Sequence, residues 1–265
     1  MGTSQVLTAL GAGAVIGLVL GLVGGGGSIL AVPLLVYGVG VQSTHAAIGT
    51  AAVAVAANAA TGLIGHAREG TVKWPCAIVF ALAGVIGAAA GAEFGMAMDG
   101  GRLLTLFGIL MIGVGLSMLR PRRAAEAPDV HLSRSTASTL LPKLLPIGFA
   151  VGLAAGFFGI GGGFLIVPGL IAATAMPLRN AVGTSLVVVM ALGITTATSY
   201  SFSGFVDWRL VALMIVGGIG GAALGLALGR RLAMRKQLLE RVFGVAVVAV
   251  GVYIASQALI GAAGA

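Results

Sequence analysis

Charged side chains are scarce in this sequence. Only 8% of its 265 residues are charged, against roughly 25% in a typical soluble chain. A soluble fold of this length covers its surface with polar groups, and this chain has too few of them. Hydrophobic residues make up 58% of the chain, which excludes a disordered protein because disorder requires low hydrophobicity. We therefore expect an all-α polytopic membrane protein whose surface contacts the lipid bilayer.

Several functional classes lack the residues they need. The net charge of +8 is carried by a few short loops, so we expect no nucleic-acid partner. Cys76 is the only cysteine, so no disulfide forms within the chain. Charged residues begin only at Arg68, so the N-terminus lacks the positive region of a secretory signal, and we expect the first apolar segment to stay in the mature protein. There is no metal-ligand spacing and no nucleophile–base pair, so we expect neither an enzyme nor a cofactor or metal.

Long charge-free stretches fill most of the chain instead. A helix needs about 20 apolar residues to cross a bilayer, so the longest stretches hold more than one segment each. The run Gly24–Gly27 is a natural break in the first of them. We predict a hairpin over 6–38 followed by helices over 44–65, 74–96 and 103–119, a polar linker over 120–143, a second hairpin over 147–175, and helices over 180–203, 208–229 and 239–260.

The pattern before the linker repeats after it. The segment GLVLGLVGGGGSILAVP, residues 17–33, matches GLAAGFFGIGGGFLIVP, residues 152–168, at an offset of 135. At an offset of 134, Gly49-Thr50 recurs as Gly183-Thr184, and Trp74 recurs as Trp208. Proline and tryptophan matches in register are not explained by abundant glycine alone. We interpret residues 1–119 and 144–265 as two copies of one ancestral unit.

The basic residues indicate how the two copies are oriented. If 6–38 crossed the membrane once, eight basic residues would lie on one side and seven on the other. If the glycine run is the tip of a hairpin, thirteen lie on one side and only Arg102 and Arg209 on the other. Cytoplasmic loops collect Lys and Arg, so we predict two inverted-topology repeats, each a Gly-tipped helical hairpin plus three transmembrane helices. Both termini would lie outside an inner membrane, with linker 120–143 in the cytoplasm.

Three short motifs occur once in each copy. They are the glycine-rich element that ends at Pro33 or Pro168, the Gly-Thr pair that starts the next helix, and a Gly-x-Val-x-Trp ending. In this combination the chain resembles the sulfite exporter TauE/SafE family of bacterial and archaeal permeases, over 10–74 and 147–208 and more weakly to the end. The resemblance implies transport of sulfite or organosulfonates, mostly outward. The first copy has Ala51 where the second has Ser185, a departure from a symmetric two-serine site.

The two glycine-rich tips are candidate anion contacts. Exposed backbone at membrane depth is tolerated only inside protein or against an aqueous cavity, and a helix start there offers unpaired N–H groups to an anion. The alternative is close helix packing through small residues. The candidate residues at the tips are Gly25, Gly26, Gly27, Ser28, Gly161, Gly162 and Gly163.

Polar side chains in the following helices are further candidates. Thr50, Thr184 and Ser185 can donate hydrogen bonds to oxyanion oxygens, or bond back to their own helices. Asn58 is a stronger candidate because a buried amide is costly unless it is paired; its alternative is a bond between helices. Thr61 is a weaker candidate. We interpret His66 as an ordinary loop residue.

Charged residues contribute little to the predicted site. Arg179 could attract anions at a cytoplasmic vestibule, or simply anchor its helix at the membrane surface. No acidic residue lies in the middle of a predicted helix, which argues against a buried carboxylate relay. It favours anion uniport, or coupling through the substrate's own protonation, since sulfite titrates near neutrality.

Together these features predict an exporter of small sulfur-containing anions that works by alternating access between two inverted repeats. One alternative is transport of another small anion or sulfur metabolite. Another is a non-transporting membrane assembly factor, although such a protein should have uniformly apolar helices. The sequence leaves the substrate, the direction, the coupling ion and the oligomeric state open.

Overall fold

The computed structural model describes residues 3–119, 132–133, 136–159, 163–231 and 236–263. Within these ranges every regular element is helical and no strand occurs, as expected for an all-α membrane protein. Seven helical segments in the described chain are long and apolar enough to cross a bilayer. They are Ser4–Leu22, Thr44–Arg68, Trp74–Ala97, Gly100–Ser117, Ala137–Phe158, Leu178–Phe202 and Trp208–Gly229.

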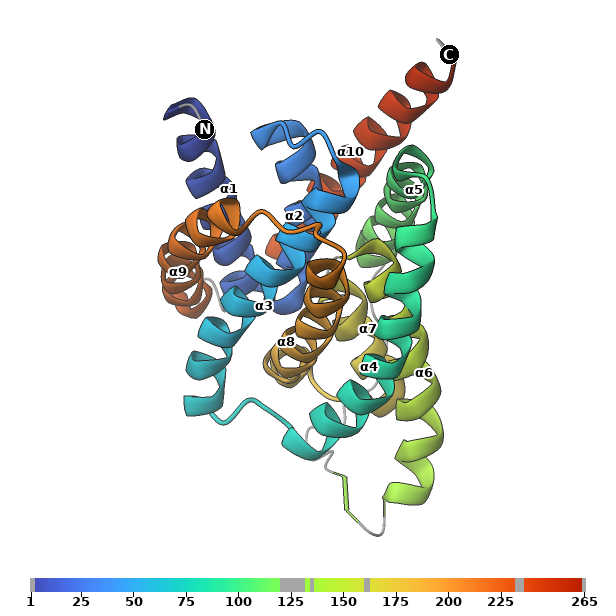
Figure 1. The fold of residues 1–265 in the computed structure, drawn as a ribbon. Helices are drawn as coiled ribbons and strands as arrows, with labels where there is room; N and C mark the ends of the chain where they lie inside the picture. The colour runs from blue at the N-terminus through green and yellow to red at the C-terminus, as the bar shows by residue number, and fades with distance from the viewer. Residues whose placement is uncertain (1–2, 120–131, 134–135, 160–162, 232–235, 264–265) are drawn as a thin grey trace.

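The order of the helices along the chain can be followed by colour in Figure 1. The first half comprises α1 (Thr3–Val23), the 3₁₀ helix η1 (Gly24–Leu30), the single turn α2 (Ala31–Pro33), the π-helix η2 (Leu34–Val39), α3 (Thr44–Arg68), α4 (Trp74–Ala97) and α5 (Gly100–Leu119). The second half comprises α6 (Ala137–Phe158), α7 (Gly163–Thr174), α8 (Leu178–Phe202), α9 (Trp208–Arg231) and α10 (Lys236–Ala263).

After α1 the chain turns back on itself. η1 packs against α1, and a Cβ added to Gly27 would meet the backbone of Leu20 and Ile16. The second half contains a related turn, where α6 ends at Gly159 with a left-handed φ of 63° and α7 packs back against α6. A side chain at Gly159 would also collide with Ile48 of α3. Glycine is therefore required at this turn by both its backbone conformation and its surroundings.

The bounds of α6 and α3 differ from the prediction in ways that matter for the site. α6 begins at Ala137, inside the stretch predicted as linker, and the backbone N–H of Ser133 donates to Thr136 Oγ1 just before it at 2.9 Å. α3 continues to Arg68 and ends where Gly70 adopts a left-handed φ of 66°. His66 therefore lies in a helix, and its interpretation as a loop residue is wrong. The predicted helix stopped where polar residues end the apolar run. The observed helix continues to Arg68, because backbone hydrogen bonds form regardless of side-chain polarity.

Glycine seams join the two halves reciprocally. α1 packs against α9, and α6 packs against α4. A Cβ at Gly17 would fall on the backbone of Gly218, and one at Gly152 on the backbone of Gly84. Glycine faces let these backbones approach closely. In a bilayer the lipid is as apolar as the helices, so helices associate through close van der Waals packing and not through the hydrophobic effect. In both seams residue numbers rise together along the two helices, so the paired helices run parallel.

The remaining helices pair with their own repeat equivalents. α3 packs against α8 and α5 against α10. Gly49 lies against Phe205 while Gly62 lies against Leu186, so α3 and α8 run antiparallel. Gly108 lies against Gly251 while Gly115 lies against Gly244, so α5 and α10 run antiparallel as well. The start of α1 and the end of α10 lie at the same end of the molecule (Figure 1).

Candidate functional site

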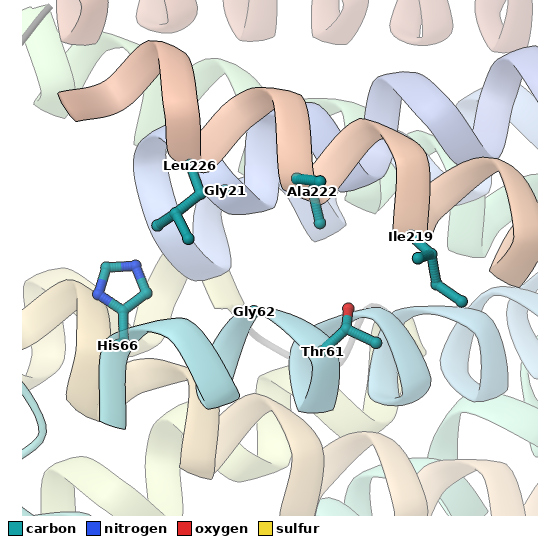
Figure 2. A pocket seen from close by; sticks show the side chains of 8 residues that line it. Gly21, Thr61, Gly62, His66, Ile219, Ala222 and Leu226 are labelled. Carbon is teal, nitrogen blue, oxygen red and sulfur yellow. The ribbon is translucent and has the colours of Figure 1, made fainter. Parts of the chain in front are cut away.

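A cleft of about 230 Å³ lies between α1, α3 and α9. Its wall on α3 carries the polar side chains, and its walls on α1 and α9 are apolar (Figure 2). The small residues of α1 and α9 leave space that larger side chains would fill. The lining residues are Gly21, Thr61, Gly62, His66, Ile219, Ala222, Ala223 and Leu226.

His66 closes one end of this cleft and has a defined tautomer. It is 7% exposed, and its Nδ1 lies 3.1 Å from Thr71 Oγ1. The Thr71 hydroxyl donates its only proton to the backbone oxygen of His66 at 3.0 Å. Nδ1 must therefore carry a hydrogen and donate it to Thr71. This link fixes the orientation of the ring from the loop that follows α3.

Asn58 lies about two turns along α3 from His66. Its side chain is fully buried, and its Nδ2 donates to the backbone oxygen of Met214 on α9 at 3.5 Å. The amide packs against Gly218, where a Cβ would overlap it. Within the described part of the chain, Asn58 Oδ1 has no hydrogen-bond partner. An unmade hydrogen bond on a buried acceptor is costly, so this atom is a candidate for binding a ligand.

Thr61 completes a polar stripe on α3. Its hydroxyl donates to the backbone oxygen of Asn58 at 2.7 Å, which leaves its lone pairs to accept. Asn58 lies between Thr61 and His66 around the helix, about 60° from the first and 80° from the second at 100° per residue; Thr61 and His66 line the cleft, and Asn58 contacts α9. The sequence contained this signal, but the assignment of His66 to a loop concealed it.

The same place in the second repeat is occupied differently. At an offset of 134, Gly62 and His66 correspond to Thr196 and Tyr200 of α8. Both side chains are fully buried, and the described residues offer no hydrogen-bond partner to Thr196 Oγ1 or the Tyr200 hydroxyl. Gly95 of α4 lies close to the Tyr200 hydroxyl, and Gly49 of α3 lies close to its Cβ.

Thr50 and Thr184 form a symmetric pair of ties between the halves. Thr50 Oγ1 accepts from the backbone N–H of Asp207, and Thr184 Oγ1 accepts from that of Lys73, both at 3.0 Å. Lys73 precedes α4 and Asp207 precedes α9. Because α3 and α8 are antiparallel, the two threonines lie at opposite ends of this helix pair and do not share one site. Ser185 is buried and donates to the backbone oxygen of Val182 at 2.7 Å.

The glycine tips are only partly described. Gly25 and Gly26 belong to η1, while Gly27 and Ser28 are buried beside α1. Gly163 is buried at the start of α7, and η1 packs against α7. The predicted contacts Gly161 and Gly162 lie outside the described residues. The two turns therefore approach each other through η1 and α7, and none of their described glycines is among the residues that line the cleft at His66.

Arg179 lies on the surface, away from the polar stripe. Its side chain is 62% exposed and its Nη2 lies 3.5 Å from Glu69 Oε2. The adjacent Asn180 donates through Nδ2 to the backbone oxygen of Thr71 at 3.0 Å. This end of α8 thus braces the loop that holds His66. An exposed ion pair of this kind contributes little energy.

A small solute in the cleft would meet polar groups on one side only. Among the described residues, no group of three or more His, Cys, Asp or Glu side chains converges on a point. The lining residues that the structure describes include no Lys, Arg, Asp or Glu. A solute in the cleft would contact the hydroxyl and imidazole groups of α3 on one side and apolar residues of α1 and α9 on the other.

Comparisons with known proteins agree with this architecture. The model of the family described as sulfite exporter TauE/SafE matches residues 9–254. A "Probable membrane transporter protein" of Xylella fastidiosa (strain 9a5c) is 50% identical over 96% of both chains. The "Probable membrane transporter protein YunE" of Bacillus subtilis (strain 168) is 27% identical over 83% of this chain and 87% of its own. No solved structure gives a significant match.

Proposed function

The chain belongs to the sulfite exporter TauE/SafE family, and we propose that it is an inner-membrane transporter that exports small sulfur-containing anions such as sulfite or organosulfonates. The proposed mechanism is alternating access between two inverted repeats, with the substrate held between α3 and α9. The family description and the names of the relatives support transport. The chemistry of the cleft supports a small, hydrogen-bonding solute.

The observation that carries the proposal is a difference between two corresponding positions, His66 on α3 and Tyr200 on α8. Beside α3 the chain leaves a cleft of about 230 Å³ with His66 at its edge. Beside α8 the equivalent position holds the buried ring of Tyr200. A transporter that opens one side at a time needs two similar routes in different states. A cleft beside His66 and a buried Tyr200 ring are what the two routes of such a transporter would show if one were open and the other closed.

The antiparallel pairing of equivalent helices supports inversion of the repeats. α3 and α8 are repeat equivalents, as are α5 and α10, and each pair runs antiparallel. Two repeats of the same orientation would place equivalent helices parallel. Repeats related by a twofold axis in the membrane plane would place them antiparallel.

The basic residues support the proposed sidedness. Arg102 lies at the start of α5 and Arg209 at the start of α9, at the end of the molecule where α1 begins (Figure 1). Arg68, Lys73 and Arg179 lie at the opposite end, beside His66. Under the positive-inside rule that second end would be cytoplasmic, which would place His66 at the cytoplasmic end of the cleft, where an exporter collects its substrate.

Flux in proteoliposomes tests the function directly. The purified chain is reconstituted, and movement of radiolabelled sulfite, sulfoacetate, taurine and acetate is followed with and without a pH gradient. We expect sulfur oxyanions to move faster than acetate, and faster than in vesicles without protein. The matched control is Ser256→Ala, which removes a hydroxyl on α10 away from the cleft. If no anion moves in the wild type, the proposed function is wrong.

Cysteine labelling tests the topology independently. Cys76 is buried and is first replaced by Ala; single cysteines are then placed at position 2 and in the linker at position 127. An impermeant thiol reagent applied to intact cells should label position 2 and leave position 127 unmodified until the cells are opened. Labelling of both positions from the same side would exclude inverted repeats with a cytoplasmic linker.

A further inference from the structure

We propose that the cleft between α3 and α9 selects a singly charged anion that also carries a hydrogen-bond donor, and that Asn58 Oδ1 accepts that hydrogen. For sulfite this is the monoprotonated form; for an organosulfonate it is a molecule with a hydroxyl or ammonium group. This inference rests on the proposed function and adds the chemical form in which the substrate is bound.

The orientation of the Asn58 amide is set by its neighbour on α9. Met214 presents a carbonyl oxygen, so the NH₂ group of Asn58 must face it, as the Nδ2–O distance of 3.5 Å shows. The amide oxygen is then directed elsewhere, and it has no partner in the described part of the chain. An acceptor without a donor is satisfied by a ligand that brings an O–H or N–H group.

Thr61 and His66 also donate hydrogen bonds to other atoms of the protein. The Thr61 hydroxyl donates to the Asn58 backbone oxygen at 2.7 Å, and the Nδ1 hydrogen of His66 is donated to Thr71. Figure 2 shows the Thr61 oxygen directed toward α9. Asn58 Oδ1, and Thr61 Oγ1 once its proton is donated, are therefore acceptors that face a ligand. A ligand with no donor of its own would meet two oxygens that it cannot pair with.

The charge of the cleft favours a monoanion over a dianion. Among the described lining residues His66 is the one titratable side chain, and the walls contributed by α1 and α9 are Gly21, Ile219, Ala222, Ala223 and Leu226. None of these described residues is a Lys or Arg that could offset a second negative charge. The desolvation cost of an ion rises with the square of its charge, so a dianion is disfavoured more strongly than a monoanion.

Asn58 does not line the cleft in this structure; it lies buried between α3 and α9, beside the inner end of the cleft. Thr61 and Gly62 line the cleft one turn toward His66, and Ile219 lines it beside Gly218, which the Asn58 amide contacts. In this structure the amide is sealed against Gly218. A ligand entering beside His66 reaches it when α9 separates from α3, a movement of one repeat against the other.

A matched pair of sulfonates tests the donor requirement. Isethionate and ethanesulfonate are both monoanions and differ by one hydroxyl. In proteoliposomes of the wild-type protein we expect isethionate to move about tenfold faster, the factor that corresponds to one net hydrogen bond. Asn58→Leu, which installs the residue found at the equivalent position 192, should abolish this preference while its thermal unfolding in detergent stays close to wild type. Ser256→Ala should keep the preference.

Sulfite tests the charge requirement through pH. At constant total concentration, wild-type flux should fall about tenfold for each pH unit above the second pKa of sulfite, because the monoprotonated fraction falls by that factor. Selenite loses its corresponding proton at higher pH, so its flux should persist to higher pH. If the two profiles coincide, a protein group such as His66 sets the pH dependence, and the proposal is wrong.

Two failures remain distinguishable. Equal flux of ethanesulfonate and isethionate in the wild type, or a preference retained in Asn58→Leu, would overturn this inference and leave anion transport standing. A wild-type protein that moves none of these anions at any pH would overturn the proposed function, and this inference with it.

Discussion

The two repeats share a backbone plan but differ beside their central helices. In each half a glycine-lined helix packs against a helix of the other half. In each half a threonine hydroxyl, Thr50 or Thr184, also accepts a hydrogen bond from the backbone N–H of the residue that precedes a helix of the other half. Where the first repeat has Gly62 and His66, the second has Thr196 and Tyr200. The parts that hold the helices together are alike in the two halves. The side chains along the proposed route have diverged, so the two routes need not open in the same way or bind the same group.

The seams should be the most sensitive part of the molecule. Gly17→Ala and Gly152→Ala each place a methyl group on the backbone of the facing helix, and overpacking costs typically about 1–3 kcal/mol. Because the clash is with backbone, we expect the upper end of this range and low yields of folded protein. Gly220→Ala is the control, since a Cβ there meets nothing within 4 Å. Thermal unfolding in detergent measures all three; tolerance of one seam variant alone would show that the seams are not equivalent.

Filling the first cleft should block transport with little loss of stability. His66→Tyr gives the first repeat the residue of the second, and we expect flux to fall by at least about tenfold, an increase of roughly 1.4 kcal/mol in the barrier. Folding is checked by gel filtration, because the variant also loses the link to Thr71. The matched control is Tyr253→Phe on α10. Flux at the wild-type rate in His66→Tyr would mean that the substrate takes another route.

The two threonine ties should contribute equally. Thr50→Val and Thr184→Val keep the shape of the side chain but remove the oxygen that accepts from Asp207 or Lys73. Each change leaves a backbone N–H without its partner, at an expected cost of about 1–2 kcal/mol in the free energy of unfolding. Thr198→Val, whose hydroxyl bonds back within α8, should cost less. A large difference between the two ties would show that one end of the protein is already loosened.

Tyr200→Phe should act in the opposite direction. The buried hydroxyl has no partner within the described residues, so its removal should raise the stability of this state by about 1 kcal/mol. If the hydroxyl is used when the second route opens, the same change should slow flux. Increased thermal stability together with reduced flux would support two states. Decreased stability would show that the hydroxyl is bonded in this state.

Arg179→Gln should have the smallest effect. The guanidinium is exposed and pairs with Glu69 at the surface, so we expect a change within about 0.5 kcal/mol in stability and within twofold in flux, roughly 0.4 kcal/mol in the barrier. Repeating the assay at high salt checks for a long-range contribution, because salt screens exposed charges. A severalfold loss of flux at low salt would restore Arg179 to the substrate path.

The sequence predicted the helical segments well because low charge and glycine breaks are local signals. The repeat also located equivalent residues, and the ties at Thr50 and Thr184 follow from that correspondence. It did not predict that those hydroxyls bind backbone N–H groups of the other half, since this depends on contacts more than 100 residues apart. Asn58 was correctly singled out as a buried amide, but its partner on α9 was not. His66 was missed because the end of an apolar run was equated with the end of its helix.

The glycine seams between the two halves, α1 with α9 and α4 with α6, also affect how the protein assembles during synthesis. The glycine face of α1 packs on α9, so Leu10 meets Gly217, about 207 residues later in the chain. At typical synthesis rates of roughly 5–20 residues per second, α1 waits some 10–40 seconds in the bilayer before its partner emerges. During that interval its bare backbone faces lipid or other proteins. Assembly therefore completes late, and separately expressed halves should acquire their tight seams only when they meet in the same membrane.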